Sequence, residues 1–512
     1  MKGERGMNIA CYLRMSAREY GDKVVAMEGN RQITYSELDD KSNRIAGWLR
    51  KSGVQPGERG IIYMPNNIEY CYLLFGMFKA GMIPIPLNYR FRKEEIRYVI
   101  MDSGASLMFV LERNASLANE LQREVSTLEQ VVVSDEGASD SNALINEVLK
   151  RYDPDPDVFP ALDDDLAMIM YTSGTTAKPK GVKQTHRNTV ANVNVFAFTQ
   201  HLTSKDRLLC ATPLFHVGGM IPTFTTIFTG GSVVFLPLWD ATRFLELVNQ
   251  KKVTWTFLVG LMGAQLASME GIDKYDLSSL KCVVFGGSPI SETIYNNFQK
   301  KFNIITYELY GRTEHVGVSV CYDVTDTRVP RSAGKLLGQV IRAKFVDPQT
   351  GKPVGIGEPG ELMVKGDILT PGYWNKPEEN IKLLDEEGWQ HTGDVFTQDD
   401  RGYLFFMERT DDMIISGGEN IYPREIESVL YNHPSVAEVA VIGLTHEEWG
   451  AQVAAVIVKK DPKLTEEEII AFLKRRKDLS GYKRPRIIKF IDQIPKTASQ
   501  KIDKASLKKL YS

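Results

Sequence analysis

A run of hydroxyl, glycine and lysine residues follows the apolar segment that ends at Tyr171. It reads Tyr171-Thr172-Ser173-Gly174-Thr175-Thr176-Ala177-Lys178-Pro179-Lys180-Gly181. Small residues allow backbone amides to turn toward an anion, hydroxyls add donors and lysines add positive charge. The run therefore suits a polyphosphate, although no Gly-Lys-Ser/Thr closes it as in the common P-loop. A solvated surface loop fits this composition equally well, so the run alone leaves both interpretations open.

Further clusters of polar and glycine residues follow in order along the chain. They are Pro213-Leu214-Phe215-His216, Gly286-Gly287-Ser288-Pro289, Tyr310-Gly311-Arg312-Thr313-Glu314, Gly388-Trp389-Gln390-His391-Thr392-Gly393-Asp394, Arg409-Thr410-Asp411-Asp412, Ser416-Gly417-Gly418-Glu419-Asn420-Ile421-Tyr422-Pro423, and a late lysine, Lys501. Together these motifs resemble the adenylate-forming superfamily of acyl-CoA synthetases, peptide-synthetase adenylation domains and luciferases. The resemblance covers nearly the whole chain and looks closest to fatty-acyl or aryl acid CoA ligases.

The resemblance implies a nucleotide site with magnesium. Glu314 is the implied Mg²⁺ ligand, Thr313 contacts the α-phosphate, and Asp394 accepts hydrogen bonds from the ribose hydroxyls, with Arg409 as a second ribose or phosphate contact. A hard cation with an oxygen ligand suits a pyrophosphate leaving group. The other implied nucleotide residues are Thr172, Ser173, Gly174, Thr175, Thr176 and Lys180 around the β and γ phosphates, and Gly286, Gly287, Ser288, Tyr310 and Gly311 around the adenine.

The same resemblance implies a moving C-terminal domain. Lys501 matches the lysine that stabilises the transition state of adenylation, and Asp411 matches the hinge residue. Rotation about the hinge withdraws the lysine and brings the segment with Gly417 and Gly418 toward the site for thiol attack. The chain departs from the family pattern at Ala177 and Gln500, where glycine is usual, and the sequence does not say how this affects the rate.

The acyl pocket is implied to be apolar and larger than acetate requires. Residues expected to line it are His216, Val217, Gly218, Met220, Val259, Phe285, Gly311 and Val316, with His216 also expected to gate the carboxylate. In the family, enzymes that activate amino acids normally carry an aspartate next to the position of His216; none adjoins it here, so the resemblance implies that an ammonium group would be buried unpaired, at a high cost. Acetate-type enzymes tend to carry tryptophan at the position of Gly311. A medium- or long-chain fatty acid, or an aryl or alicyclic acid, is therefore expected.

The elements that position these residues alternate between helix and strand. Apolar periodicity predicts helices over 35–49 and 68–80, separated by a strand over 60–64. Strand-like runs return at 166–171, 281–285 and 304–310. This alternation predicts an α/β fold with a parallel sheet covered by helices, and glycine-bearing turns at strand ends are where such folds bind ligands.

The pattern of secondary-structure signals along the chain changes twice after this region. Short strands with frequent Gly and Pro over about 331–410 predict a small β-barrel-like subdomain within an N-terminal domain of residues 1–410. From Asp411 to residue 512 the pattern predicts a small, mobile α+β domain, with a capping-box helix start at Thr465 and Glu468. The expected architecture is thus a large helix-covered domain followed by a small one.

Composition restricts the partners and the compartment. The 512 residues carry a formal net charge of -3 with both signs interspersed, which disfavours nucleic acid. The 5 cysteines lie far apart without a CxxC pair, which favours a reducing cytoplasm. No apolar run is long enough to predict a transmembrane segment. The sequence does not decide the oligomeric state, and a homodimer stays open.

These observations predict a carboxylate-CoA ligase that uses ATP, Mg²⁺ and coenzyme A. The acid would be converted to an acyl adenylate with release of pyrophosphate, and then transferred to CoA with release of AMP. Two alternatives remain: a freestanding ligase that loads a carrier protein, and a non-catalytic nucleotide-binding relative. CoA-dependent turnover separates the first alternative from the main prediction.

Overall fold

The chain forms two compact units in the computed structural model. The structure describes residues 6–134, 144–172, 178–287, 290, 292–338, 341–417, 419–476, 479–496 and 502–511. The first unit contains residues up to 342 together with 365–388, and the second contains 343–364 together with 389–512. Each unit is described separately below.

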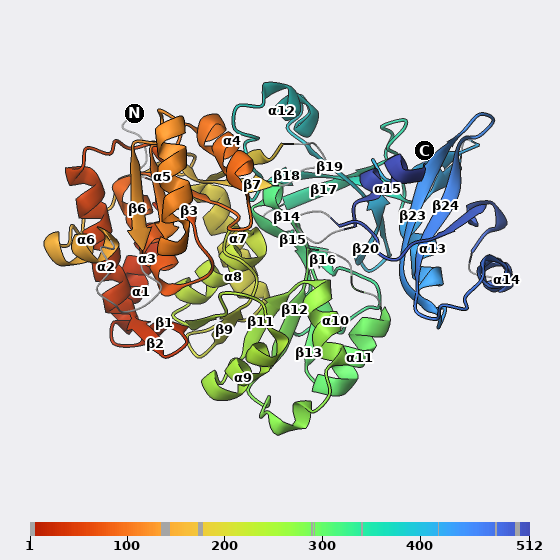
Figure 1. Cartoon of the computed structure of the whole chain (residues 1–512), viewed down its shortest axis with the longest axis horizontal. Helices are drawn as coiled ribbons and strands as arrows, with labels where there is room; N and C mark the ends of the chain where they lie inside the picture. The colour runs from red at the N-terminus through yellow and green to blue at the C-terminus, as the bar shows by residue number, and fades with distance from the viewer. Residues whose placement is uncertain are drawn as a thin grey trace. The chain divides into compact units, whose positions relative to one another are not determined.

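A seven-stranded sheet is the centre of the first unit, with the order β13-β12-β11-β9-β10-β1-β2 (Figure 1). All neighbours run parallel except β1 and β2, which are antiparallel. Every residue of β11 and β12 is buried, as expected for parallel strands covered on both faces. The strands are β1 (Val24–Glu28), β2 (Arg31–Thr34), β9 (Arg207–Cys210), β10 (Ser232–Phe235), β11 (Trp255–Leu258), β12 (Cys282–Phe285) and β13 (Ile305–Glu308).

Helices cover both faces of this sheet. The helix α8 (Val217–Phe228) packs against β9, β10 and β11 on one face. The opposite face forms a hydrophobic core in which Leu209, Leu258 and Phe285 pack with apolar residues of three other helices. Those helices are α9 (Ala241–Lys251), α10 (Gly260–Ser268) and α11 (Glu292–Phe302).

A smaller parallel sheet in the same unit has the order β4-β3-β5-β6. Its strands are β3 (Arg59–Tyr63), β4 (Ile83–Pro86), β5 (Leu107–Leu111) and β6 (Gln130–Ser134), and the helices of this region are α1 (Ala10–Tyr20), α2 (Tyr35–Lys51), α3 (Ile68–Ala80), α4 (Lys93–Ser103), α5 (Ala115–Glu124) and α6 (Leu144–Arg151). Local signals explain the helix ends: Thr34 and Glu37 form a capping box at the start of α2, and Gly81 ends α3 in a left-handed conformation. The predicted helices and strand of this region are confirmed.

Antiparallel strands flank the parallel sheets of the first unit. The run at 166–171, predicted as one of the repeating α/β strands, instead pairs antiparallel with the strand that follows it, because only 7 residues separate Thr172 from Lys180 and no crossover helix intervenes. This hairpin consists of β7 (Leu166–Thr172) and β8 (Lys180–Thr185), and a second antiparallel set consists of β14 (Tyr310–Arg312), β15 (Gly317–Cys321) and β16 (Lys335–Leu336). The remaining helices of the unit are α7 (His186–Thr199), α12 (Pro377–Leu383) and the short 3-10 turns η1 (Glu112–Asn114), η2 (Ile272–Lys274) and η3 (Thr313–His315).

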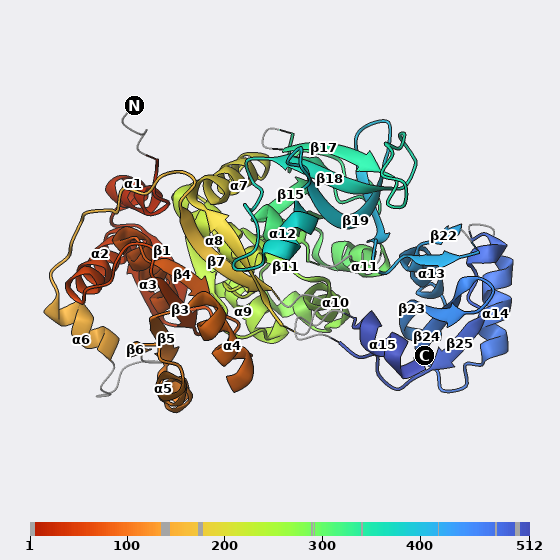
Figure 2. The same ribbon diagram turned by 90° about the horizontal axis from the view of Figure 1, so that it is seen from above.

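The second unit combines antiparallel sheet with a small α+β body. In Figure 2, α14 and α15 lie on opposite sides of the sheet β23-β24-β25, which agrees with its two separate apolar faces. The strands are β17 (Ile341–Val346), β18 (Gly360–Gly366), β19 (Gln390–Gln398), β20 (Leu404–Arg409), β21 (Ile414–Ser416), β22 (Glu419–Ile421), β23 (Val436–His446), β24 (Gly450–Lys459) and β25 (Ile487–Phe490). The helices are α13 (Pro423–Leu430), α14 (Glu466–Arg475), α15 (Lys504–Tyr511) and the turn η4 (Gly481–Lys483).

The predicted fold class is confirmed: the chain is α/β, with a large N-terminal and a small C-terminal part. The capping box of Thr465 and Glu468 begins α14 as predicted. Chain contacts group β18, β19 and β20 with the C-terminal elements, so the boundary at residue 411 remains a prediction from sequence.

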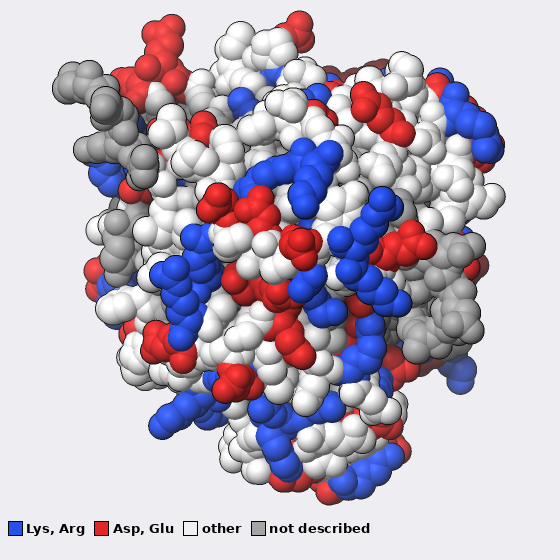
Figure 3. Space-filling view, turned by 90° about the vertical axis from the view of Figure 1, so that its left-hand side faces the viewer, with Lys and Arg blue, Asp and Glu red and all other residues white. Residues whose placement is uncertain are grey.

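The distribution of surface charge and the apolar character of the helices bear on binding to a charged partner or to a membrane. On the face shown in Figure 3, Lys and Arg side chains alternate with Asp and Glu, and no continuous basic patch covers that face. Among the described helices, none combines the length and the apolar character needed to cross a membrane.

Candidate active site

The carboxyl ends of the parallel strands bring several predicted site residues to one edge of the large sheet. Segment 212–216 follows β9, Val259 follows β11, Gly286 follows β12, and Tyr310 lies two residues beyond β13. Neighbouring parallel strands end on the same side, so these residues gather along one edge. In open α/β sheets this edge is where ligands bind.

The β7–β8 hairpin presents the predicted phosphate run. Thr172 and Lys180 are paired at the end of the hairpin, on either side of that run. The Lys180 ammonium donates to Glu379 Oε2 at 2.7 Å and lies 5.5 Å from the centre of the Tyr373 ring. Hydrogen bonding from Lys180 lowers the pKa of the Glu379 carboxyl. A cation is therefore held at the base of the hairpin tip.

Asp102, at the end of α4, forms hydrogen bonds both with the β7–β8 hairpin and with segment 374–376. Its Oδ2 accepts a hydrogen bond from the Tyr171 hydroxyl at 2.7 Å, and its Oδ1 accepts from Lys376 Nζ at 2.9 Å. The backbone oxygen of Asp102 also accepts from Trp374 Nε1 at 3.0 Å. Sequence reasoning missed Asp102, because nothing in its local pattern distinguishes it from a surface carboxylate on a helix.

Glu314 lies in the turn η3, and its carboxylate contacts a tyrosine hydroxyl and an arginine side chain. The Tyr373 hydroxyl donates to Glu314 Oε1 at 2.7 Å, and Arg312 Nε lies 3.5 Å from Oε2. Burial would raise the pKa of Glu314, but the Arg312 charge and the Tyr373 hydrogen bond outweigh it and lower that pKa below its ordinary value. Glu314 is therefore ionised and available as an oxygen ligand.

The turn that carries Glu314 is held from behind by α7. The buried Asn192 side chain donates to the backbone oxygens of His315 at 3.3 Å and Val318 at 2.7 Å, and accepts from Val318 N. Between them, Val316 is fully buried with φ of 55°, a left-handed conformation that a β-branched residue rarely adopts. Backbone strain of this kind persists only where the surroundings enforce it and is concentrated at functional sites.

The close approach of the neighbouring strand explains why residue 311 is a glycine. A Cβ added to Gly311 would collide with the carbonyl oxygen of Gly317 on the paired strand β15. The backbone of β15 therefore occupies the direction that a side chain at this position would take.

The predicted pocket residues Gly218 and Phe285 lie on opposite faces of the large sheet. A Cβ on Gly218 would lie 2.6 Å from the ring of Phe257, and one on Gly286 would lie 2.8 Å from the same ring. Phe285, expected in the acyl pocket, instead packs in the core on the opposite face, edge-on to Phe298 and against Gly263. Phe257 is thus the aromatic residue beside Gly218.

The other predicted acyl residues are distributed around the start of α8. His216 caps the N-terminus of α8, and its ring lies 4.3 Å from that of Phe215. Val217 and Val259 are half-buried, whereas Met220 is fully buried within α8. The Tyr310 ring lies edge-on to the buried His315 ring at 6.1 Å.

In the second unit, Asp394 and Arg409 are direct neighbours on paired strands. They are paired in register between β19 and β20, with Arg409 Nε 3.6 Å from Asp394 Oδ1. The Asp394 side chain is largely buried, whereas that of Arg409 is 43% exposed. Gly417 adopts φ of 59°, as a tight turn requires, and Asp411 is exposed.

Comparison with known proteins now places the chain in a family. The family described as AMP-binding enzyme matches residues 13–374, and the AMP-binding enzyme C-terminal domain matches residues 425–501. This chain belongs to the AMP-binding enzyme family. The family predicted from the ordered motifs is thereby confirmed.

Full-length relatives of this AMP-binding enzyme are known. A feruloyl-CoA synthase from Amycolatopsis sp is 36% identical over 504 residues, covering 97% of each chain. The long-chain-fatty-acid–CoA ligase FadD13 from Mycobacterium tuberculosis is 33% identical over 489 residues, covering 94% of this chain and 93% of the relative. The crystal structure of ATP-bound MatB from Rhodopseudomonas palustris superimposes with a TM-score of 0.91 at 27% identity, covering 98% of each chain.

Several predicted residues of the AMP-binding enzyme lie outside the described part of the chain, so their roles remain predictions. They are Ser173, Gly174, Thr175, Thr176, Ser288, Gly418 and Lys501, together with the departures Ala177 and Gln500. Lys504, three positions after Lys501, is described: its Nζ lies 3.1 Å from both Glu408 Oε2 and Glu427 Oε1. These carboxylates raise the pKa of Lys504 against the opposing effect of burial.

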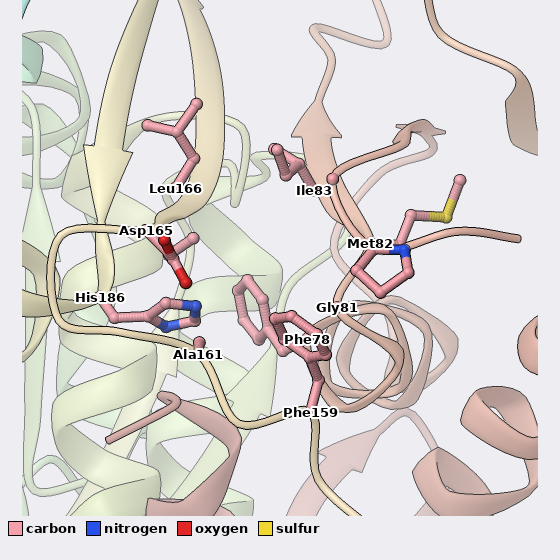
Figure 4. A pocket seen from close by; sticks show the side chains of 12 residues that line it. Phe78, Gly81, Met82, Ile83, Phe159, Ala161, Asp165, Leu166 and His186 are labelled. Carbon is pink, nitrogen blue, oxygen red and sulfur yellow. The ribbon is translucent and has the colours of Figure 1, made fainter. Parts of the chain in front are cut away.

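A separate cavity of about 300 Å³ in the first unit contains none of the predicted site residues. Figure 4 shows the aromatic rings of Phe78 and Phe159 opposite His186 around it. His186 Nδ1 accepts a hydrogen bond from Ile9 N at 3.1 Å, and burial lowers the pKa of this imidazole to about 4. His186 therefore supports the fold as a neutral hydrogen-bond acceptor.

Proposed function

We propose that this AMP-binding enzyme is an AMP-forming carboxylate-CoA ligase for apolar acids. In the first step, the carboxylate oxygen attacks the α-phosphorus of ATP, giving an acyl adenylate and pyrophosphate. In the second step, the CoA thiol loses its proton and attacks the acyl carbon, giving a thioester and AMP.

The observation that carries this proposal is the full-length likeness to CoA ligases combined with the local geometry around Glu314. A relative named feruloyl-CoA synthase and one named long-chain-fatty-acid–CoA ligase each match more than nine-tenths of the chain. The Tyr373 hydroxyl donates to the Glu314 carboxylate, and the Lys180 ammonium lies 5.5 Å from the centre of the same ring, which supports a site where both charges lie close to Tyr373. That arrangement suits a nucleotide triphosphate carrying a metal.

Adenylation requires two anions to approach each other, so the site must supply positive charge and hold both in line. Lys180 and Thr313 are proposed to bind the phosphates, and Lys501 to stabilise the transition state. The residues of the hairpin tip, Thr172, Ser173, Gly174, Thr175 and Thr176, are proposed to complete the phosphate contacts. Glu379 must then exchange its contact with Lys180 for a neighbour or for solvent.

Glu314 is the proposed Mg²⁺ ligand, and its surroundings fit that role. Among the described residues, no group of three His, Cys, Asp or Glu side chains could form a complete metal cage. Mg²⁺ is commonly held by one or two carboxylates together with substrate phosphates and water, so a single ionised carboxylate is sufficient. When bound, the metal supplies charge neutralisation of the pyrophosphate leaving group.

The remaining nucleotide and CoA contacts are proposed residue by residue. Asp394 binds the ribose hydroxyls with Arg409 beside it, and Tyr310 stacks on the adenine. Gly286, Gly287, Ser288 and Gly311 line the adenine, and Gly417 and Gly418 serve the thiol step, with Asp411 as the hinge. The buried Asp394 carboxylate next to a half-exposed Arg409 supports this assignment.

The acid is proposed to be apolar, of an aryl or a fatty type. One relative is named for feruloyl-CoA, an aryl acid thioester, and another for long-chain fatty acids. The half-buried side chains of Val217 and Val259 support an apolar wall.

The test is CoA-dependent AMP release from ATP and Mg²⁺ across a panel of acetate, hexanoate, decanoate, palmitate, benzoate and cinnamate. The proposal expects turnover with at least one of the apolar acids and little with acetate. If acyl adenylate forms but CoA gives no thioester, the acceptor is a carrier protein instead. If ATP binds and no acid is activated, the ligase proposal fails.

A further inference from the structure

The backbone around Tyr373 is hydrogen-bonded to β8, the strand that begins with Lys180. Val182 of β8 and Tyr373 form an antiparallel bridge. Beside this bridge, Trp374 N donates to the backbone oxygen of Gly181 at 2.7 Å. Main-chain hydrogen bonds of this kind fix the position of Tyr373 relative to the strand that carries Lys180.

The side chain of Tyr373 is fixed as well. Asn380 on α12 accepts a hydrogen bond from Tyr373 N at 2.6 Å through Oδ1 and donates to Tyr373 O at 3.0 Å through Nδ2. The Tyr373 ring is 8% exposed and packs with Val182 and Leu383 in a small apolar cluster. An aromatic side chain has few rotatable bonds, so these contacts leave the ring little freedom to turn.

Two groups of opposite charge converge on this ring. The Tyr373 hydroxyl donates to Glu314 Oε1 at 2.7 Å, and Lys180 Nζ lies over the ring at 5.5 Å from its centre. A hydroxyl suits a carboxylate as a donor, and the electron-rich face of an aromatic ring attracts a cation. The backbone oxygen of Glu314 also accepts from Thr370 N at 2.8 Å, so the segment that carries Tyr373 holds the turn η3 too.

We propose that Tyr373 is a positioning residue, which holds the Glu314 carboxylate and the Lys180 ammonium at a fixed separation for the metal and the phosphates of one nucleotide. This inference rests on the proposed function and deepens it. A misplacement of about 1 Å can cost a reaction about 100-fold in rate, so this separation matters. Without the hydroxyl, the Glu314 carboxylate would be free to turn toward Arg312, whose Nε lies 3.5 Å from Oε2 and would compete with a cation.

The experiment measures ATP binding to the full-length protein by calorimetry, once with Mg²⁺ and once with EDTA. Tyr373→Phe keeps the ring beneath Lys180 and removes only the hydroxyl. The gain in ATP affinity that Mg²⁺ provides should fall by about tenfold or more, because a hydrogen bond to a charged group is lost. The affinity in EDTA should stay within about twofold of wild type, since the ring is retained. Tyr373→Leu should lower the affinity in EDTA as well, because Lys180 loses the ring.

Tyr35→Phe is the matched control. The buried Tyr35 hydroxyl donates to Gly231 O at 2.7 Å, outside the proposed site. This variant should lose stability and keep the full gain in ATP affinity from Mg²⁺. If Tyr373→Phe does not fold, Asn380→Ala carries the test, because it frees the backbone of Tyr373 and should reduce the same gain.

A double variant shows whether Tyr373 acts through Glu314. If it does, Tyr373→Phe combined with Glu314→Gln should bind ATP and Mg²⁺ no more weakly than Glu314→Gln alone. Losses that add in the double variant, or a gain from Mg²⁺ in Tyr373→Phe equal to that of wild type, would overturn the inference. A wild type that binds ATP with Mg²⁺ but activates no acid would overturn the proposed function instead, and the binding comparison would still decide the role of Tyr373.

Discussion

At the scale of single residues, Glu314 combines burial with net stabilisation of its charge. Because the pKa of Glu314 is lowered, its carboxylate stays ionised across the neutral range. It loses its charge only when the pH falls below the ordinary pKa of a glutamate side chain. Glu314→Gln should reduce kcat/KM for ATP by about 100-fold or more and raise the Mg²⁺ concentration needed for half-maximal rate. AMP release measured against Mg²⁺ concentration tests this.

A control carboxylate is available in the same unit. Glu292 on α11 forms an ion pair with Arg328 at 2.6 Å and lies outside the proposed site. Glu292→Gln should leave the Mg²⁺ dependence of the rate unchanged. An unchanged Mg²⁺ dependence in Glu314→Gln as well would remove Glu314 from the metal site.

His186 makes a separate prediction about pH and stability. Its pKa is about 4 in the folded chain and 6.5 in the unfolded chain, so only the unfolded chain gains a proton between these values. Stability is therefore complete above pH 6.5 and declines as the pH falls toward 4, by at most about 3 kcal/mol of unfolding free energy. Urea unfolding of wild type and His186→Gln at about pH 7.5 and about pH 5 tests this. The variant should be less sensitive to pH, and equal sensitivity would contradict the assignment.

Two residues show which contacts the sequence alone does not reveal. Strands β11 and β12 are buried at every position, so their sequences contain no alternation that would tell one face from the other. The sequence therefore does not say on which face of the sheet Phe285 lies, whereas the pairing register and the contact with Phe298 place it on the face covered by α9, α10 and α11. Likewise, the reason for Gly311 lies on β15, a contact with Gly317 that no local pattern reveals.

At the scale of elements, α7 supports the strained turn between β14 and β15. Asn192→Ala would leave the backbone groups of His315 and Val318 buried without their partner, which should cost about 2–4 kcal/mol of unfolding free energy. The rate of adenylation should fall with it, because η3 carries Thr313 and Glu314. Thermal unfolding and pyrophosphate exchange measure the two effects.

Asn194 on the same helix provides the comparison, because it is exposed. Asn194→Ala should change neither stability nor rate beyond small surface effects. If Asn192→Ala behaves like Asn194→Ala, then α7 does not hold the turn and the conformation of Val316 needs another explanation.

Element types were predicted better than strand partners. The helices α2, α3 and α14 are marked by capping residues and by apolar periodicity. These signals involve only residues of the helix itself and its ends, so they can be recognised in the sequence. The pairing of β7 depends on which strand lies beside it, and the run at 166–171 looks like the strands of the parallel sheet. The short separation between Thr172 and Lys180 is the one local feature that distinguishes a hairpin strand from a strand of the parallel sheet.

At the scale of the whole molecule, the enzyme is proposed to use one site for two reactions in turn. The groups that stabilise phosphoryl transfer differ from those that admit a thiol, so a single fixed arrangement cannot be optimal for both. The proposed hinge at Asp411 and the proposed catalytic Lys501 would together provide the alternation that the family resemblance implies. Lys501 should therefore serve the first half-reaction alone.

Lys501→Ala tests this division of labour by measuring the half-reactions separately. Formation of acyl adenylate, followed by pyrophosphate exchange, should fall by about 100-fold or more, because a charge aimed at the transition state is lost. Thiolysis of a supplied acyl adenylate by CoA should change by less than about threefold, because Lys501 is withdrawn in that step. Lys509 on α15 is exposed, and Lys509→Ala should leave both rates unchanged. Equal losses in the two half-reactions of Lys501→Ala would mean that this lysine acts on the stability of the C-terminal part, and the alternation mechanism would lose its main residue.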